Sequence, residues 1–174
     1  MTRAWHAART PTTMPDADLA PDPRADALAT LDAKFAAMPP AAAMRIRGVV
    51  LDDDGLHLHA PLAQNVNDKG CAFGGSLASV LTLAGWGLVV ARLRMAGRVA
   101  DVYVADSRLR YLLPLYADID AHARLAPGED WAAFVRCLDE RGKARLALEA
   151  EVRDPAGTVV ATLAARFAAL RPSR

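Results

Sequence analysis

The feature that most constrains this chain is a long stretch without a charged side chain, Gly70–Ala91. At ~1.5 Å of rise per residue, a helix of this length could cross a bilayer. Several glycines and hydroxyl-bearing residues lower its hydrophobicity, and no second stretch of the kind occurs in the chain. The sequence therefore favours a helix buried on nearly all sides of a soluble domain over a membrane span.

Length and charge narrow the choice of fold and partner. The 174 residues suffice for one domain with a core of its own. Apolar residues make up 53% of the chain and charged residues 24%, which is an ordinary globular composition. The 21 basic and 20 acidic side chains are well mixed, and the net charge is +1. We therefore expect neither nucleic acid nor a membrane surface as the main partner.

The N-terminal segment and the cysteines bear on location. Residues 1–22 are rich in Ala, Pro, Thr and Asp without a period, so we expect a disordered or loosely attached segment before a domain over residues 23–174. No apolar segment typical of a secretory signal is visible there. Cys71 and Cys137 are far apart and belong to no paired motif. A reducing compartment, the cytoplasm, is the predicted location.

Hydrophobic periodicity predicts the elements around the uncharged stretch. A helix is expected over Pro23–Ala37, where apolar residues recur at helical spacing, and Pro39-Pro40 would stop it. A period of two begins at Met44, and Asp52–Gly55 is typical of a hairpin turn. That period predicts strands at about residues 44–50, 56–60, 102–113, 118–125, 143–153 and 158–170, with a short amphipathic helix over 128–141.

The order of these elements predicts the fold class. Two strands precede the long helix and four follow it, without the βαβ repeats of a parallel sheet. One apolar helix among six antiparallel strands can be covered only if the sheet curls around it. We therefore expect an α+β fold in which a curled antiparallel sheet wraps one long central helix. The sheet edge and the start of the helix are then left for a partner subunit.

Chemistry is predicted in the segment Asn65–Ser76, directly ahead of the long helix. The start of a helix has unpaired N–H groups and a partial positive charge. Gly74 and Gly75 would let a carbonyl oxygen approach those N–H groups closely. Asn65, Asn67 and Asp68 could orient a water molecule or hold the carbonyl group. The alternative is a purely structural segment, in which Asn and Asp form turns and the glycines permit packing.

The full string of residues resembles a known family. It runs Asn65-x-Asn67-Asp68-Lys69-Gly70-x-Ala72-Phe73-Gly74-Gly75-Ser76-Leu77, followed by Leu83-Ala84-Gly85-Trp86-Gly87. Ser107-x-x-x-Tyr111-x-x-Pro114 and Gly142-Lys143-Ala144-Arg145 extend the match. Together they resemble the hot-dog thioesterase family of the YiiD C-terminal type, also found as the C-terminal domain of some GNAT-type acetyltransferases.

The resemblance implies both a fold and a function. It implies the hot-dog fold and an obligate homodimer, with assembly into a tetramer left open and the active site between subunits. It also implies a thioesterase, a hydrolase that acts on acyl-CoA or acyl-carrier-protein thioesters. Such hydrolysis by water requires no redox cofactor and no metal ion, and the histidines show no metal-ligand spacing.

The sequence departs from the wider hot-dog thioesterases at two positions. Those enzymes have the pattern Asn-x-x-Gly-x-x-His-Gly-Gly and an acidic residue further along the helix. Here Phe73 stands at the His position and Thr82 at the acidic one. Asp68 is then the one carboxylate of the segment that could serve as the base. The predicted catalytic residues are Asn67, Asp68, Gly74 and Gly75.

Further residues are candidates for substrate binding, each with a structural alternative. The substrate-binding candidates are Asn65, Phe73, Ser76, Thr82, Trp86, Lys143 and Arg145. Trp86 lines an acyl tunnel or packs in the core, and Ser76 caps or packs. Lys143 and Arg145 meet CoA phosphates or are solvated strand charges. For Cys71 we favour packing over a nucleophilic role.

Two functions remain open at this point. The first is hydrolysis of an acyl thioester, with the carbonyl polarised at Gly74 or Gly75 and water activated by Asp68 or Asn67. The second is a non-hydrolytic acyl-CoA or acyl-carrier-protein binding protein, which keeps the pocket and lacks the base. His57, His59 and His122 are expected on solvated strand faces and in neither role.

Overall fold

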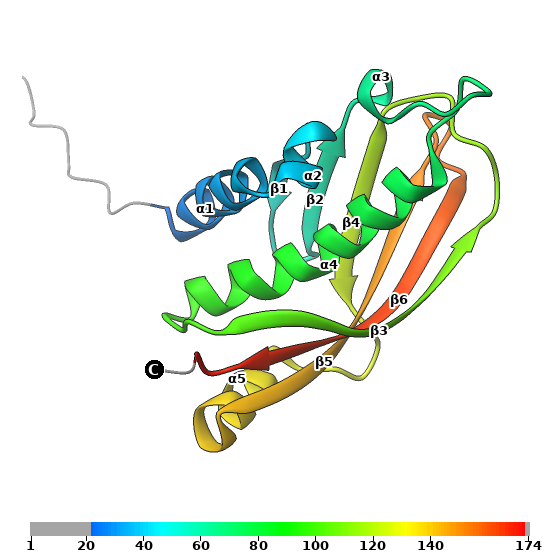
Figure 1. Ribbon diagram of the computed structural model, residues 1–174. Helices are drawn as coiled ribbons and strands as arrows, with labels where there is room; N and C mark the ends of the chain where they lie inside the picture. The colour runs from blue at the N-terminus through cyan, green and yellow to red at the C-terminus, as the bar shows by residue number, and fades with distance from the viewer. Residues whose placement is uncertain (1–21, 173–174) are drawn as a thin grey trace, which may run out of the picture.

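The computed structural model describes residues 22–172, and it has a long helix held in a curled sheet (Figure 1). The six strands are all antiparallel, in the order β1-β2-β4-β5-β6-β3. The helices are α1 Pro23–Ala37, α2 Pro39–Ala43, α3 Leu62–Asn65, α4 Gly74–Met95 and α5 Trp131–Arg141. The strands are β1 Arg47–Leu51, β2 Leu56–Ala60, β3 Asp101–Tyr111, β4 Ile119–Leu125, β5 Lys143–Arg153 and β6 Val159–Leu170. The predicted fold class is confirmed.

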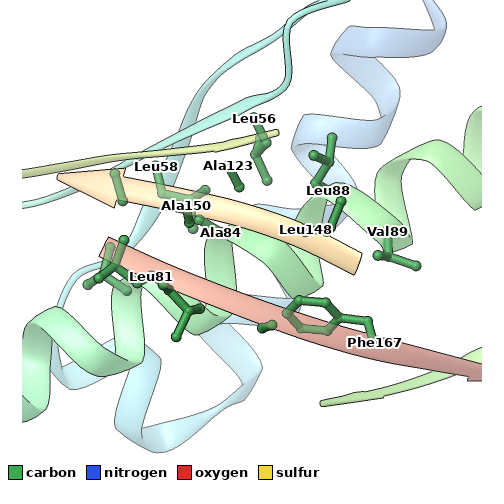
Figure 2. Close-up of a cluster of buried hydrophobic side chains, with 14 of the residues drawn as sticks. Leu56, Leu58, Leu81, Ala84, Leu88, Val89, Ala123, Leu148, Ala150 and Phe167 are labelled. Atoms are coloured by element: carbon green, nitrogen blue, oxygen red, sulfur yellow. The ribbon is translucent and has the colours of Figure 1, made fainter. Parts of the chain in front are cut away.

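Helix α4 is the core of the domain. Its buried side chains pack against the inner faces of β2, β4, β5 and β6, as Figure 2 shows around Leu81, Ala84 and Leu88. A Cβ atom on Gly85 would lie 2.7 Å from the Phe167 ring, so glycine permits this close packing. By length and composition alone α4 could cross a membrane, but 61% of its most apolar window is buried by the rest of the chain. That burial is typical of a core helix.

Helix α1 covers one flank of α4. Asp22 caps its start by accepting from Arg24 N at 2.9 Å, and Pro23 occupies the first turn, where its missing N–H is not needed. The bounds Pro23–Ala37 are as predicted. The prediction of a disordered segment over residues 1–22 concerns residues that, apart from Asp22, lie outside the described part of the chain.

In the region between α1 and β1 the structure differs from the predicted start of the first strand. Pro39-Pro40 ends α1 but also begins α2, because proline is well accommodated in the first turn of a helix. The strand predicted from Met44 begins only at Arg47. Arg45 has a φ of 52°, a left-handed conformation that interrupts any extended run there.

The strands have one apolar and one polar face. In β5 the residues from Ala144 to Val152 alternate between the core and the outer face, as predicted. Strand β3 is an edge strand, paired with β6 on one side only, and most of its residues are exposed. The loop before α4 lies with α3 at one end of the sheet, and α5 lies at the other end (Figure 1).

Candidate active site

The segment before α4 is a tight hairpin-like loop. Val66 and Ala72 form a β-bridge, and Asn67 N donates to Cys71 O at 2.8 Å. Gly70 closes the loop with a φ of 80°, which glycine adopts without strain. Ala72 N donates to Leu115 O at 2.7 Å and ties the loop to the chain that follows β3. The start of α4 is thereby fixed.

The side chain of Asn67 makes its hydrogen bonds within the loop itself. Its Oδ1 accepts from Lys69 N at 2.8 Å and from Cys71 N at 3.3 Å. Its Nδ2 donates to Cys71 Sγ at 3.2 Å. Both ends of the side chain therefore stabilise the turn. Cys71 is buried at 7% exposure beside it, as expected of a packing residue.

Asp68 does not meet the requirement for a base. Its side chain is 81% exposed and pairs with Lys69 at 3.2 Å. No hydrogen bond within residues 22–172 links it to Gly74 or Gly75. A general base needs to lie within hydrogen-bond reach of the water that it activates. We therefore withdraw the assignment of Asp68 as the base.

Asn65 is, with Ser76, one of two buried polar residues at the site. It is 2% exposed, and its Nδ2 donates to Met44 O at 3.0 Å and to Pro61 O at 2.8 Å. Its backbone O accepts from Phe73 N at 2.6 Å, directly before α4. Its Oδ1 is buried and has no hydrogen-bond partner within the described chain. A buried acceptor of this kind is costly unless something donates to it.

The start of α4 has free donors. The backbone N–H groups of Gly74, Gly75 and Ser76 have no backbone acceptor in residues 22–172, and Phe73 at the N-cap gives no side-chain cap. These groups and the helix dipole favour a negatively polarised oxygen at this point. The geometry is that of a site that can hold a carbonyl group.

Phe73 and Gly75 lie against each other at this point. Phe73 is 55% exposed. A Cβ atom on Gly75 would lie 2.3 Å from Phe73 Cε1, closer than any real contact. The ring that replaces the histidine of the wider pattern therefore rests on the glycine. Its exposure leaves the ring room to move aside.

Tyr111 is a residue that the sequence reasoning did not assign to the site. Its hydroxyl donates to Gly74 O at 2.9 Å, so the end of β3 is tied to the first residue of α4. A Cβ atom on Gly74 would lie 3.6 Å from the Tyr111 ring. The signal was present in the sequence, because Tyr111 is part of the motif that extends the family resemblance.

Comparison with known proteins decides the family. A protein-family profile described as "Putative thioesterase (yiiD_Cterm)" matches residues 29–171. The chain belongs to this thioesterase family. No curated protein matches the chain.

Solved structures support the same assignment. A protein of unknown function from Chlorobaculum tepidum TLS is 28% identical, with a TM-score of 0.80 over 86% of this chain and 97% of that one. A "putative thioesterase" from Shewanella oneidensis is 26% identical, with a TM-score of 0.76 over 84% and 99%. A Pseudomonas aeruginosa protein named a "Probable Thioesterase" is 25% identical, with a TM-score of 0.67 over 82% and 94%. The hot-dog fold expected from the resemblance is thereby confirmed.

The remaining substrate-binding candidates of this thioesterase are divided between core and surface. Ser76 is buried at 6% exposure in the first turn of α4. Thr82 lines a groove beside α4. Trp86 packs against the core, with its Nε1 donating to Val102 O at 3.0 Å.

Lys143 and Arg145 lie away from the loop. Both side chains are on the outer face of β5, at its start near α5. Arg145 of β5 and Tyr103 of β3 lie on opposite sides of Ala168 in β6, the residue with which each is in register. From Tyr103 to Tyr111, which contacts Gly74, strand β3 spans roughly 25 Å at the usual rise per residue. Within one subunit the structure does not bring these cations to Gly74, and their role with CoA phosphates stays a prediction.

Three histidines, His57, His59 and His122, form a cluster on the outer face of the sheet. His57 and His122 stack with ring centroids 4.1 Å apart, and His59 Nδ1 lies 2.8 Å from Asp120 Oδ1. Partial burial, with His57 and Arg124 nearby, lowers the pKa of His122. These side chains are on the polar strand faces that were predicted, but they are paired and partly buried rather than freely solvated.

Proposed function

We propose that this chain hydrolyses acyl thioesters of coenzyme A or of acyl carrier protein. Membership of the thioesterase family supports the reaction class. The observation that carries the proposal for this chain is the start of α4, where Gly74 and Gly75 present N–H groups without acceptors. In the proposed reaction these groups hold the thioester carbonyl oxygen and stabilise the negative charge that forms on it.

Water is the proposed nucleophile. It attacks the carbonyl carbon, the C–S bond breaks, and the thiolate takes the proton that the water loses, which yields a free acid and a thiol. In this proposal Asn65 Oδ1, which is buried without a partner, accepts a hydrogen bond from the attacking water. Tyr111 positions Gly74 through the bond between its hydroxyl and Gly74 O.

We also propose that two copies complete the site. Within residues 22–172 no strand pairs with the outer edge of β3, and Tyr103, Val104 and Tyr111 on this strand are exposed. A long exposed edge strand is a template for pairing with another strand. Pairing of two β3 edges would join the sheets of two subunits beside the start of α4. Sedimentation analysis should show a dimer at micromolar concentration, whereas a stable, active monomer would refute the shared site.

Release of free thiol from purified protein tests the activity. Acyl-CoA thioesters of several chain lengths would be incubated with wild type and with Gly75→Val, in which the side chain blocks approach to the N–H groups. The proposal expects turnover by wild type and a loss of about 10²-fold or more in the variant. Turnover that is equal in both would exclude the start of α4 as the carbonyl site.

One observation favours the non-hydrolytic alternative. Phe73 and Thr82 stand where the wider hot-dog thioesterases have His and an acidic residue, and within residues 22–172 no carboxylate is hydrogen-bonded to Gly74, Gly75 or Tyr111. A binding protein would hold acyl-CoA and release no thiol. Calorimetric titration with acyl-CoA, run beside the thiol assay, separates the two functions.

A further inference from the structure

An uncharged groove runs beside the candidate site, between α4 and the turn that joins α1 to β1. Its volume is about 520 Å³, within the range of small-molecule sites. Its lining residues are Ala37, Met38, Pro39, Pro40, Ala41, Met44, Ala78, Ser79, Thr82 and Leu83. None of these side chains is charged, and the two hydroxyl groups are its only polar side-chain groups. The groove therefore suits an apolar ligand.

One wall of the groove begins about one helical turn beyond Gly75, at Ala78 and Ser79. Ser79 Oγ, in its wall, donates to Gly75 O at 2.9 Å. On the opposite wall, Met44 O accepts from Asn65 Nδ2 at 3.0 Å. Gly75, Ser79 and Thr82 follow one another at helical spacing and so lie along one face of α4. A chain that is attached to a carbonyl at Gly75 and follows this face of α4 would reach the groove within about one turn, ~5 Å.

An aromatic pair lies further along α4, beyond the lining residues of the groove. Trp86 lies one turn beyond Thr82 on the same face of α4 and packs on Phe35, with ring centroids 6.2 Å apart. The hydrogen bond from Trp86 Nε1 to Val102 O fixes the indole in place. From Gly75 to Leu83 the helix advances ~12 Å. An extended alkyl chain advances ~1.3 Å per carbon, because its bonds of ~1.5 Å zigzag, so this length holds roughly ten carbons.

We propose that this groove binds the acyl chain of the substrate and that the enzyme prefers medium-chain thioesters of up to roughly ten carbons. The proposal rests on the proposed function, since the acyl chain would reach the groove from the proposed carbonyl site. A second copy of the chain is the rival occupant. The exposed edge of β3 offers that copy a different surface, and the groove lies on α4 and α2.

Variants on the helix face test the assignment. Ala78→Phe fills the groove close to Gly75, and Thr82→Leu fills it further along with a smaller change. Ala133→Phe makes the same exchange as Ala78→Phe on an exposed position of α5, outside the groove, and is the matched control. Two series are measured for each protein. One is hydrolysis of saturated acyl-CoAs from four to sixteen carbons, and the other is calorimetric binding of S-alkyl-CoA thioethers, which cannot be hydrolysed.

In wild type, affinity should rise by at most about fourfold per methylene group up to roughly ten carbons and then level off. Ala78→Phe should move the preferred length to six carbons or fewer, Thr82→Leu should shorten it less, and Ala133→Phe should leave it unchanged. Chain-length-dependent binding without hydrolysis would refute the proposed reaction and leave the groove assignment standing. Hydrolysis with the same length profile in Ala78→Phe and wild type would overturn the groove assignment alone. Loss of the dimer in Ala78→Phe with an unchanged profile would identify the partner subunit as the occupant and overturn it as well.

Discussion

The start of α4 and the outer face of the sheet differ in how their polar groups are satisfied. On the outer face charged side chains find partners, as Arg153 does with Glu151 at 2.8 Å and Arg124 with Glu149 at 3.3 Å. At the start of α4 the free polar groups carry no formal charge. They are backbone N–H groups and the buried Oδ1 of Asn65.

This difference indicates which polar groups of the chain are available to bind a ligand. Satisfied ion pairs on a surface contribute little and have no capacity left for a ligand. Unsatisfied donors and acceptors cost free energy until a ligand meets them. The ion pairs of the outer face therefore indicate sheet stability, and the uncharged segment indicates binding. His122 Nε2 is an exception on the outer face, because it is buried without a hydrogen-bond partner in residues 22–172.

The largest expected effect comes from Gly75. Gly75→Ala should lower the rate of thioester hydrolysis by about 10²-fold, because a side chain there obstructs the carbonyl site. The new Cβ also meets the Phe73 ring, so loss of packing is the rival explanation. Hydrolysis is measured by thiol release, and folding by thermal unfolding.

The double variant Phe73→Ala/Gly75→Ala separates these explanations. Removing the exposed Phe73 ring relieves the contact with the new methyl group. If Gly75 serves the carbonyl, the double variant folds and stays slow relative to Phe73→Ala. Recovery to the rate of Phe73→Ala would show that Gly75 only makes room for the ring. The start of α4 would then not differ from the outer face of the sheet as a place for chemistry.

Tyr111 should give the next largest effect. Tyr111→Phe removes the hydroxyl that donates to Gly74 O, so the first residue of α4 loses its tie to β3. We expect kcat to fall by about tenfold while the free energy of unfolding changes by about 1 kcal/mol, the usual net value of one hydrogen bond. Tyr116→Phe is the matched control, because Tyr116 is exposed and its hydroxyl makes no hydrogen bond in the described chain. Equal kcat values for the two variants would leave Tyr111 without a role in the site.

The fold was predictable because its causes are local and periodic. The long uncharged stretch favours a helix buried at the centre of the domain. The period of two in β5 determines which residues of that strand face the core and which face outward. The turn before β1 was not predictable from the same signals. There Pro39 both ends one helix and begins another, and the left-handed Arg45 delays the strand.

The site was predictable only in part. The family motif in the sequence points to the segment and both glycines, and their role with the carbonyl group stays a prediction. The sequence alone does not show which side chains make their hydrogen bonds within the loop. Asn67 and Asn65 look alike in sequence, yet Asn67 is fully hydrogen-bonded within the turn and Asn65 keeps a free Oδ1. Tyr111 reaches Gly74 only because β3 runs back along α4, which is a tertiary effect.

The outer face should respond to pH through stability. Burial, His57 and Arg124 lower the pKa of His122, while Glu151 and Asp52 oppose them. The unfolded chain therefore binds a proton at His122 more readily than the folded chain does. The contribution of His122 to stability is therefore fully present above a pH of about 6.5, the ordinary histidine pKa, and is lost as the pH drops below it. His122→Gln should flatten this dependence of the unfolding midpoint between about pH 5 and 7, above the range in which carboxylates titrate. An unchanged slope would assign the dependence to other groups.

The smallest effect is expected at Asp68, which sharpens the contrast within the loop itself. Asp68 has the one carboxylate of the segment, and a count of charged residues would place the chemistry there. Its side chain is 81% exposed and pairs with Lys69, which is 73% exposed, an arrangement that contributes little to stability and positions nothing. Asp68→Asn keeps the size of the side chain and removes the charge. We expect kcat/KM to stay within about twofold of wild type, where loss of a general base would cost about 10²-fold or more. Asn65→Ala, by comparison, removes the buried amide and should slow hydrolysis well beyond any loss of folded protein, which unfolding measurements quantify. A large loss in Asp68→Asn with Asn65→Ala unaffected would reverse the assignment. The base would then be a carboxylate that moves into the cleft when a second subunit or the substrate is bound.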